Sequence, residues 1–204
     1  MTTANPTNSL AVEDLGSAAQ RDRRKRILDA TIALASQGGF DAVQMRAVAE
    51  KADVALGTLY RYFPSKIHLL VSTLAREFHR IEQDTRDQAI PGDTAPDRVR
   101  VVLGGVFRGL QQDPQLAEAL TRAFMFADSS VSEAIDEVTV LLGQMITRAI
   151  RGDRSDAAPS EQEALTASII GDVWHSALMS WVTGRLTTTQ VLERVDRAVA
   201  LVLR

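Results

Sequence analysis

Hydrophobic residues in the first third of the chain recur at intervals of three and four, the spacing that gives a helix one apolar face. The pattern predicts a first helix over residues 20–37, ended by Gly38-Gly39, because glycine is common where a helix stops. Two short apolar sets follow: Met45, Val48 and Ala49, and then Val54, Leu59 and Phe63. They predict two short helices about a tight turn, which is a helix-turn-helix unit.

The rest of the chain repeats the helical pattern, and most of its helices have a clear start signal. Ser65 can cap a long amphipathic helix that fades near residue 90. Later capping residues, several followed by a proline or by a Glu or Gln three positions on, are Thr94, Asp113, Ser130, Ser160 and Thr187. No segment alternates apolar and polar residues as a strand does, so the predicted fold class is all-α.

These elements divide the chain into three parts. Residues 1–19 are polar and aperiodic, and we expect them to be disordered. Residues 20–66 form a three-helix helix-turn-helix domain for DNA binding. Residues 67–204 form a larger helical domain for ligand binding and dimerisation, entered through a connector helix over residues 65–89.

Charge is distributed unevenly along the 204 residues. Residues 21–66 contain nine Arg or Lys and five Asp or Glu, a net charge of +4, although the whole chain carries −3. A basic helix-turn-helix on an acidic body is the asymmetry expected of a DNA-binding domain joined to a regulatory one. We therefore predict that double-stranded DNA is a partner.

Composition excludes several other kinds of site. The chain has no cysteine, and its three histidines have no spacing that binds a metal or pairs with a serine. We therefore expect no metal, no cofactor and no enzyme activity. No stretch approaches the ~18 apolar residues that span a bilayer, and the N-terminus lacks an apolar targeting segment, so we expect a cytoplasmic protein that does not contact the membrane.

Residues that face DNA should lie on the second helix of the motif and at the starts of its neighbours. Thr58 and Arg61 are our candidates for base edges, because Arg pairs two donors with guanine and Thr can bond a base or touch a thymine methyl group. Gly57 permits close backbone approach. Gln44 and Arg46 open the preceding helix and can add contacts to phosphates.

The run RDRRKR at residues 21–26 is a second basic feature. Arg21, Arg23 and Arg24 can form a flexible arm that follows phosphates or enters the minor groove. A solvated helix start accounts for the same residues equally well, so both interpretations stay open.

A set of spaced residues matches a known pattern: Arg26-Ile27-Leu28-Asp29-Ala30, Gly38-Gly39-Phe40-Asp41-Ala42-Val43, Val48-Ala49, Ala52-Asp53-Val54, Gly57-Thr58-Leu59-Tyr60, Phe63, Lys66 and Leu69. Together they resemble the DNA-binding domain of TetR-type transcriptional regulators. The chain departs from the pattern at Asp53, where glycine is usual, at Gln44, where threonine is common, and at Ala55, which cannot cap the recognition helix as serine would. Asp53 still tolerates the left-handed turn better than most residues.

The resemblance implies further contacts and a narrower relationship. Tyr60 and Lys66 match positions that commonly touch the DNA backbone in the family. Ordinary packing at the domain surface is the alternative for Tyr60 and Tyr62, and we favour it for Tyr62. The run VALGTLYRYFPSKIHLL at residues 54–70 is similar to the actinobacterial repressors of sterol (cholesterol) catabolism.

Residues 161–182 and 191–202 are apolar on more than one helical face. A helix with two apolar faces has a second surface to bury. We expect these two C-terminal helices to pair with their copies in a homodimer, as a four-helix bundle, and the resemblance favours this. Two DNA-binding heads then require a near-palindromic operator. The alternative is that both helices complete a monomeric core.

Large, adaptable side chains on the central helices are candidate ligand contacts: Phe107, Leu110, Leu120, Phe124, Met125, Met145, Trp174, Leu178 and Trp181. Taken singly, each is more often a core residue, but the resemblance implies a body with an apolar cavity. It also implies a steroid acid or its coenzyme A (CoA) thioester as the effector. The acidic end could meet one of four arginines that otherwise form surface ion pairs: Arg98, Arg100, Arg108 and Arg122.

Gly104, Gly105 and Gly109 interrupt a helical segment, where each costs about 1 kcal/mol relative to alanine. A bend beside a cavity or close helix packing can offset that cost, and we favour packing.

The sequence thus predicts a ligand-responsive, dimeric transcriptional repressor that an apolar effector releases from DNA. A response to another hydrophobic ligand, such as a fatty acyl-CoA or a drug, and activation instead of repression are the alternatives. A ligand carrier without DNA binding is more remote.

Overall fold

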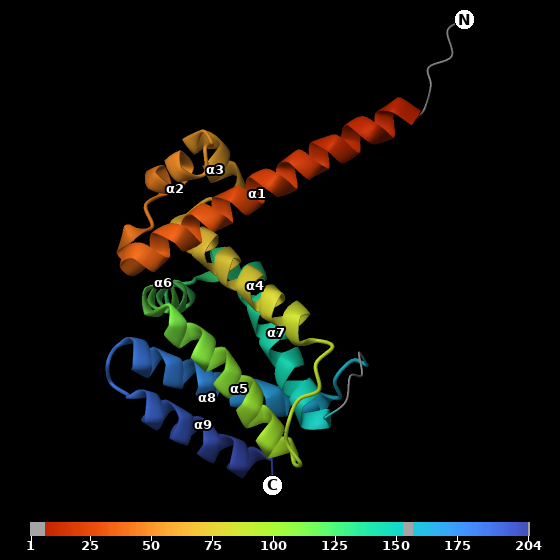
Figure 1. Cartoon of the computed structure of the whole chain (residues 1–204), viewed down its shortest axis with the longest axis vertical. Helices are drawn as coiled ribbons and strands as arrows, with labels where there is room; N and C mark the ends of the chain where they lie inside the picture. Colours follow the sequence, from red (N-terminus) through yellow and green to blue (C-terminus); the bar gives the residue numbers. More distant parts are fainter. Residues whose placement is uncertain (1–6, 153–156, 204) are drawn as a thin grey trace, which may run out of the picture.

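The computed structural model describes residues 7–152 and 157–203, and all the regular secondary structure in this part of the chain is helical, with no strand (Figure 1). The elements, in chain order, are α1 (Thr7–Ala42), α2 (Met45–Lys51), α3 (Leu56–Tyr62), α4 (Lys66–Thr85), α5 (Ala95–Gln112), α6 (Pro114–Met125), the 3-10 helix η1 (Ser129–Val131), α7 (Ser132–Arg151), α8 (Glu161–Val182) and α9 (Thr188–Val202). The all-α prediction is confirmed.

The start signals are confirmed at five helices and wrong at one. Ser65, Thr94, Asp113, Ser160 and Thr187 each accept a hydrogen bond from a backbone N–H of the helix they precede. Ser130 does not cap α7, because it lies inside η1, whose cap is the Asp128 carboxylate. The extra turn moves the start of α7 to Ser132.

The N-terminal prediction needs correction. Residues 7–19 were expected to be disordered, but α1 begins at Thr7 and continues through them, and residues 1–6 lie outside the described residues. After Pro6 the sequence contains no proline before Gly38, and an isolated Gly16 costs only about 1 kcal/mol, so nothing local stops the helix. Figure 1 shows the N-terminal half of α1 extending away from the other helices.

α1, α2 and α3 form the head of the molecule, the part predicted to bind DNA, and a side chain of α1 fixes the turn between α2 and α3. Asp53 has a positive φ of 52°, as expected of the residue that stands in a glycine position. The Arg26 guanidinium donates to the carbonyl oxygens of Ala52, at 2.8 Å, and Asp53, at 3.4 Å. Ala55, at the start of α3, makes no capping bond, as predicted.

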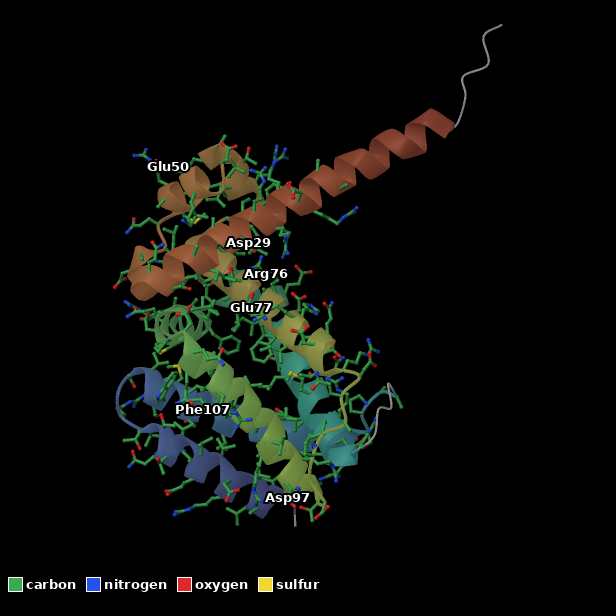
Figure 2. All side chains as sticks on the ribbon, in the orientation of Figure 1. Asp29, Glu50, Arg76, Glu77, Asp97 and Phe107 are labelled. Atoms are coloured by element: carbon green, nitrogen blue, oxygen red, sulfur yellow. The ribbon has the colours of Figure 1, made fainter. Side chains whose placement is uncertain are left out.

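The first straight segment of α1 ends at Gly38-Gly39 as predicted, and a short segment then runs to Ala42 in a different direction. Gly38 and Gly39 have non-helical backbone angles, so the helix stops there and a short turn leads to Ala42. Gly39 has φ +64°, a conformation that side chains disfavour. Two further contacts tie the head to α4: Arg76 donates to the Asp29 carboxylate at 2.7 Å (Figure 2) and to the Lys25 carbonyl oxygen at 3.5 Å.

The body is formed by α4 to α9, with α8 and α9 side by side at its lower edge in Figure 1. Its buried core centres on Phe107, whose ring meets Trp174 and Trp181 edge to face, with centroids 5.9 and 5.1 Å apart. Such pairs add about 0.5–1.5 kcal/mol beyond the burial of their surface.

One acidic side chain, Glu163, joins the start of α8 to the end of α7. Glu163 accepts two hydrogen bonds from Arg151, at 2.7 and 2.8 Å, and two from the backbone N–H and hydroxyl of Ser160. The bonds from Arg151, followed by those from Ser160, lower the pKa of Glu163 from 4.5 to about 2.

Because the folded state lowers this pKa, Glu163 stabilises the fold above pH about 4.5, and this contribution is lost as the pH falls towards 2. We expect Glu163→Gln to lower the urea midpoint at pH 7 and the difference from wild type to disappear near pH 2. Glu161→Gln, at the start of the same helix without these bonds, is the control and should change little. A difference for Glu163→Gln that is independent of pH would contradict this assignment.

Candidate DNA-binding face and ligand cavity

The exposed face of α3 carries three of the residues predicted to contact DNA. Gly57, Tyr60 and Arg61 are exposed, Thr58 is half-buried, and Leu59 points into the head. A Cβ on Gly57 would meet no atom within 4 Å, so packing does not explain this glycine. α2 and α3 lie on the side of α1 that faces away from the body, which leaves this face accessible (Figure 1).

The neighbouring predicted contacts lie around α3. Gln44 and Arg46 are exposed at the start of α2, and Gln44 donates weakly to the carbonyl of Asp41, at 3.3 Å. Arg24 places its guanidinium 5.6 Å from the Phe63 ring centroid, beside the end of α3. These positions bring the residues to one end of the molecule, while their contacts with DNA stay predictions.

The basic run at residues 21–26 belongs to the middle of α1. Neither a flexible arm nor a helix start describes Arg21, Arg23 and Arg24, since the helix begins at Thr7. Arg21 and Arg24 are exposed and Arg23 is half-buried.

Lys66 lies at the junction of head and body. Its ammonium is 3.8 Å from the Phe40 ring centroid, and Arg122 of α6 lies 4.5 Å from the same centroid. Burial is the main cause that lowers the pKa of Lys66; Arg122 adds to it and Asp41 opposes it. The backbone contact that the resemblance implied for Lys66 stays a prediction, but its cation–π contact with Phe40 is a structural role that sequence reasoning missed.

A cavity of about 940 Å³ lies in the body, walled by α4 to α8 and by the segment before α5. Six of the nine predicted ligand residues line it: Leu110, Leu120, Phe124, Met145, Trp174 and Leu178. The other wall residues are largely apolar too, including Phe78, Ile81, Val102, Val106 and Leu142.

Phe107, Met125 and Trp181 do not line the cavity, contrary to the prediction. Phe107 is fully buried between Trp174 and Trp181 and serves the core. Met125 is 43% exposed, in a small surface groove with Phe126 and Met179. The helical periodicity identifies apolar positions, but it does not show whether a side chain enters the core, lines the cavity or stays at the surface.

Three of the four arginines proposed for the acidic end of a ligand have structural partners. Arg98 donates to the carbonyl oxygens of Ala149 and Ile150 at the end of α7. Arg100 pairs with Asp97 and Asp196, and Arg122 lies over Phe40. Arg108 is exposed at the cavity wall and, within the described part of the chain, has no ion-pair partner.

Glycines on α5, α7 and α8 line the cavity. Close helix packing, which we favoured for the glycines of α5, therefore does not explain Gly105 or Gly109, whereas Gly104 lies outside the cavity lining. A Cβ on Gly109 or Gly143 would meet no atom within 4 Å, and one on Gly105 or Gly171 would meet only side-chain atoms at 3.8 or 3.7 Å. No helix approaches closely at these positions. Their missing side chains widen the cavity at a cost of about 1 kcal/mol each.

α6 separates the cavity from the DNA-binding head. Leu116, Ala117 and Phe124 line the cavity from α6. On another side of the helix, Glu118 accepts a hydrogen bond from the backbone N–H of Phe40 at 2.7 Å. Arg122, one turn later, pairs with Asp41 of the same turn at 3.4 Å.

The hydrophobic core of the head also extends into α6. Ala119, Leu120 and Ala123 are buried in the same cluster as Ile27, Leu59 and other head residues. Leu120 belongs to this cluster and also lines the cavity. A change in the shape of the cavity at α6 is therefore a change in the support of the head.

No group of His, Cys, Asp or Glu in the described residues is arranged to hold a metal ion. No helix in the same residues is long and apolar enough to cross a membrane.

Comparison with known proteins identifies both parts of the chain. Residues 27–73 match the family described as "Bacterial regulatory proteins, tetR family", and residues 92–202 match "Tetracyclin repressor-like, C-terminal domain". The HTH-type transcriptional repressor KstR of Rhodococcus jostii is 52% identical over 195 residues, which cover 96% of this chain and 89% of that protein.

Solved structures agree. The crystal structure of a TetR transcriptional regulator from Rhodococcus sp. RHA1 has a TM-score of 0.82 and 30% identity, covering 91% of this chain and 97% of that one. The crystal structure of Thermus thermophilus FadR, a TetR family repressor in complex with lauroyl-CoA, shares the fold, with a TM-score of 0.67, 19% identity and coverage of 88% and 93%.

The cavity glycines generate a prediction about stability. Gly109→Ala and Gly143→Ala should each stabilise the fold by up to about 1 kcal/mol, because the new methyl group enters open space and alanine favours the helix. Gly39→Ala should destabilise it, since φ is +64° and the Cβ would lie 2.6 Å from a Glu118 oxygen. Thermal melts followed by circular dichroism would measure all three. A loss of stability in both cavity variants would show that these glycines serve packing.

Proposed function

Because this chain belongs to the TetR family of bacterial regulatory proteins, we propose that it is a homodimeric repressor of near-palindromic operator DNA, released by a steroid acid or its CoA thioester. One observation carries the proposal: α6 lines a large apolar cavity and also holds the turn that ends the first helix of the DNA-binding head. A ligand in the cavity and DNA on the head then act on a shared element.

The charge and the exposed face of α3 support DNA binding. Arg61 is exposed with no hydrogen bond or ion pair to any described residue, so its guanidinium is available for a guanine edge. Tyr60 is 46% exposed beside it. Gly57 leaves room for a phosphate backbone to approach α3.

Exposed apolar residues on the last two helices support a dimer. Leu165 and Ile169 of α8 are 55% and 41% exposed, and Leu192 and Leu201 of α9 are 43% and 62% exposed. α8 and α9 pack on each other, and Leu165 and Ile169, four residues apart, share one exposed surface of α8. Pairing with a second copy would bury this surface and complete a four-helix bundle.

The size and chemistry of the cavity support a bulky lipid effector. A volume of about 940 Å³ is at the upper end of the roughly 300–1,000 Å³ usual for ligand sites. Glycines on its wall add width, which a rigid ring system needs and a single acyl chain does not. Arg108 at the wall is suited to a carboxylate or a CoA phosphate.

The relatives support the same class of ligand. KstR of Rhodococcus jostii, 52% identical over most of the chain, is a transcriptional repressor, and residues 54–70 of this chain resemble the actinobacterial repressors of sterol catabolism. The Thermus thermophilus FadR structure contains lauroyl-CoA. A fatty acyl-CoA is therefore the second candidate effector, and nothing in the described residues favours an enzyme over a regulator.

Release follows from the opposition of the two ligands. The effector and the operator favour different positions of α6 relative to α1, so each lowers the affinity for the other by the same factor. The connector α4 contributes as well, because Arg76 joins it to α1 through Asp29. In this mechanism, α6 links the cavity to the head, as does the connector helix α4 that the sequence predicted.

DNA binding is tested with an operator selected from random duplexes, using fluorescence anisotropy. Arg61→Ala should lower affinity about tenfold or more, since a bidentate base contact contributes roughly 1–3 kcal/mol. Arg185→Ala, an exposed arginine outside the head, is the charge control and should have little effect. A steroid acid CoA thioester should release the bound wild type, and release by lauroyl-CoA alone would favour the second candidate.

The dimer is tested with Leu165→Glu and Ile169→Glu combined. Two charges in the proposed interface should shift the protein to monomers in sedimentation equilibrium and weaken operator binding, because each monomer then holds one half-site. Helical content by circular dichroism should stay unchanged. A variant that remains dimeric would place the interface elsewhere.

A further inference from the structure

His175 is a polar side chain inside the apolar cavity. It lies on α8 next to Trp174 and about one turn before Leu178, and all three residues line the cavity. Its ring packs edge to face on Phe124 of α6, with centroids 4.7 Å apart.

The Nε2 atom of His175 is buried and, within the described part of the chain, has no hydrogen-bond partner. A buried polar atom without a partner costs about 1–3 kcal/mol, and native proteins rarely leave one in place without a reason. The neighbouring side chains of Trp174 and Leu178 are mainly apolar, and the Phe124 ring cannot accept or donate a normal hydrogen bond.

The charge state of His175 suits an uncharged partner. Burial lowers the pKa of His175, and Asp172, one turn earlier on α8, opposes this only in part. The imidazole is therefore neutral at pH 7, with one N–H and one lone pair. A neutral imidazole is suited to a carbonyl or hydroxyl oxygen.

We propose that the His175 side chain turns towards the cavity when an effector binds and hydrogen-bonds through Nε2 to a single uncharged oxygen, a ketone or hydroxyl, on the ring system of the effector. The inference rests on the proposed function, because it requires that an apolar effector occupies the cavity. Arg108 would meet the acidic end of that effector, so His175 is assigned to a separate group on the same molecule.

The position of His175 connects recognition to release. Phe124, which the imidazole contacts, lies on α6 six residues after Glu118, which holds Phe40 of the head. An oxygen bound at His175 therefore sits beside the helix that supports the DNA-binding head. Ligands with and without this oxygen should differ in release of DNA as well as in affinity.

The test uses three steroid acids that differ only at the 3 position: 3-oxo-5β-cholanic acid, the 3-hydroxy acid and unsubstituted 5β-cholanic acid. Calorimetry on the full chain measures affinity, and operator anisotropy measures release. The wild type should bind the better oxygenated acid about tenfold more tightly than the unsubstituted one, the value of one buried hydrogen bond.

His175→Phe should reduce this ratio to about one while leaving the affinity for the unsubstituted acid unchanged or higher, because phenylalanine keeps the edge contact with Phe124. His175→Asn should retain part of the discrimination. His79→Phe, an exposed histidine outside the cavity that contacts Glu137, is the matched control and should keep the wild-type ratio.

Two failures are distinguishable. If the wild type binds the acids and is released by them without discrimination, or if His175→Phe keeps the discrimination, the role of His175 is wrong and the proposed function stands. If none of the acids binds or releases the wild type, the proposed steroid effector fails and this inference fails with it.

Discussion

The structure depends on α6 being shared by the head and the body. A carboxylate on this helix accepts the backbone N–H of Phe40, and Gly39 has the positive φ that lets the chain present this N–H. Apolar residues of α6 complete the core of the head, so the two parts are not joined by a linker alone. The same helix has its other side on the cavity, which is the structural basis of the ligand response proposed above.

The cavity exists because other parts of the body are packed well enough to stabilise it. Phe107, Trp174 and Trp181 form an edge-to-face cluster beside it, and the buried faces of α5, α7, α8 and α9 surround that cluster. The glycines on the wall lower helix stability and bury no surface. A compact core thus offsets the cost of an empty space, which is the balance that a protein with a large ligand site must reach.

The features that the sequence predicted correctly depend on contacts between residues close together in the chain. Ser65, Asp113 and Thr187 cap their helices because a side-chain oxygen needs only the next turn, and Asp53 adopts its left-handed angle for similarly local reasons. The rest depends on the rotation of helices against each other. Phe107 and Leu110 lie three residues apart, yet one enters the core and the other the cavity. The contact of Lys66 with Phe40 crosses 26 residues and has no sequence signal.

Arg98 joins two helices at the end of the body that lies away from α6. Its guanidinium binds the last carbonyl oxygens of α7, at 2.8 and 2.9 Å, and those of Gly92 and Asp93 just before α5, so the far ends of these two helices are clamped together. In the proposed mechanism, a bound effector would therefore displace α6 more readily than the ends of α5 and α7 that Arg98 joins.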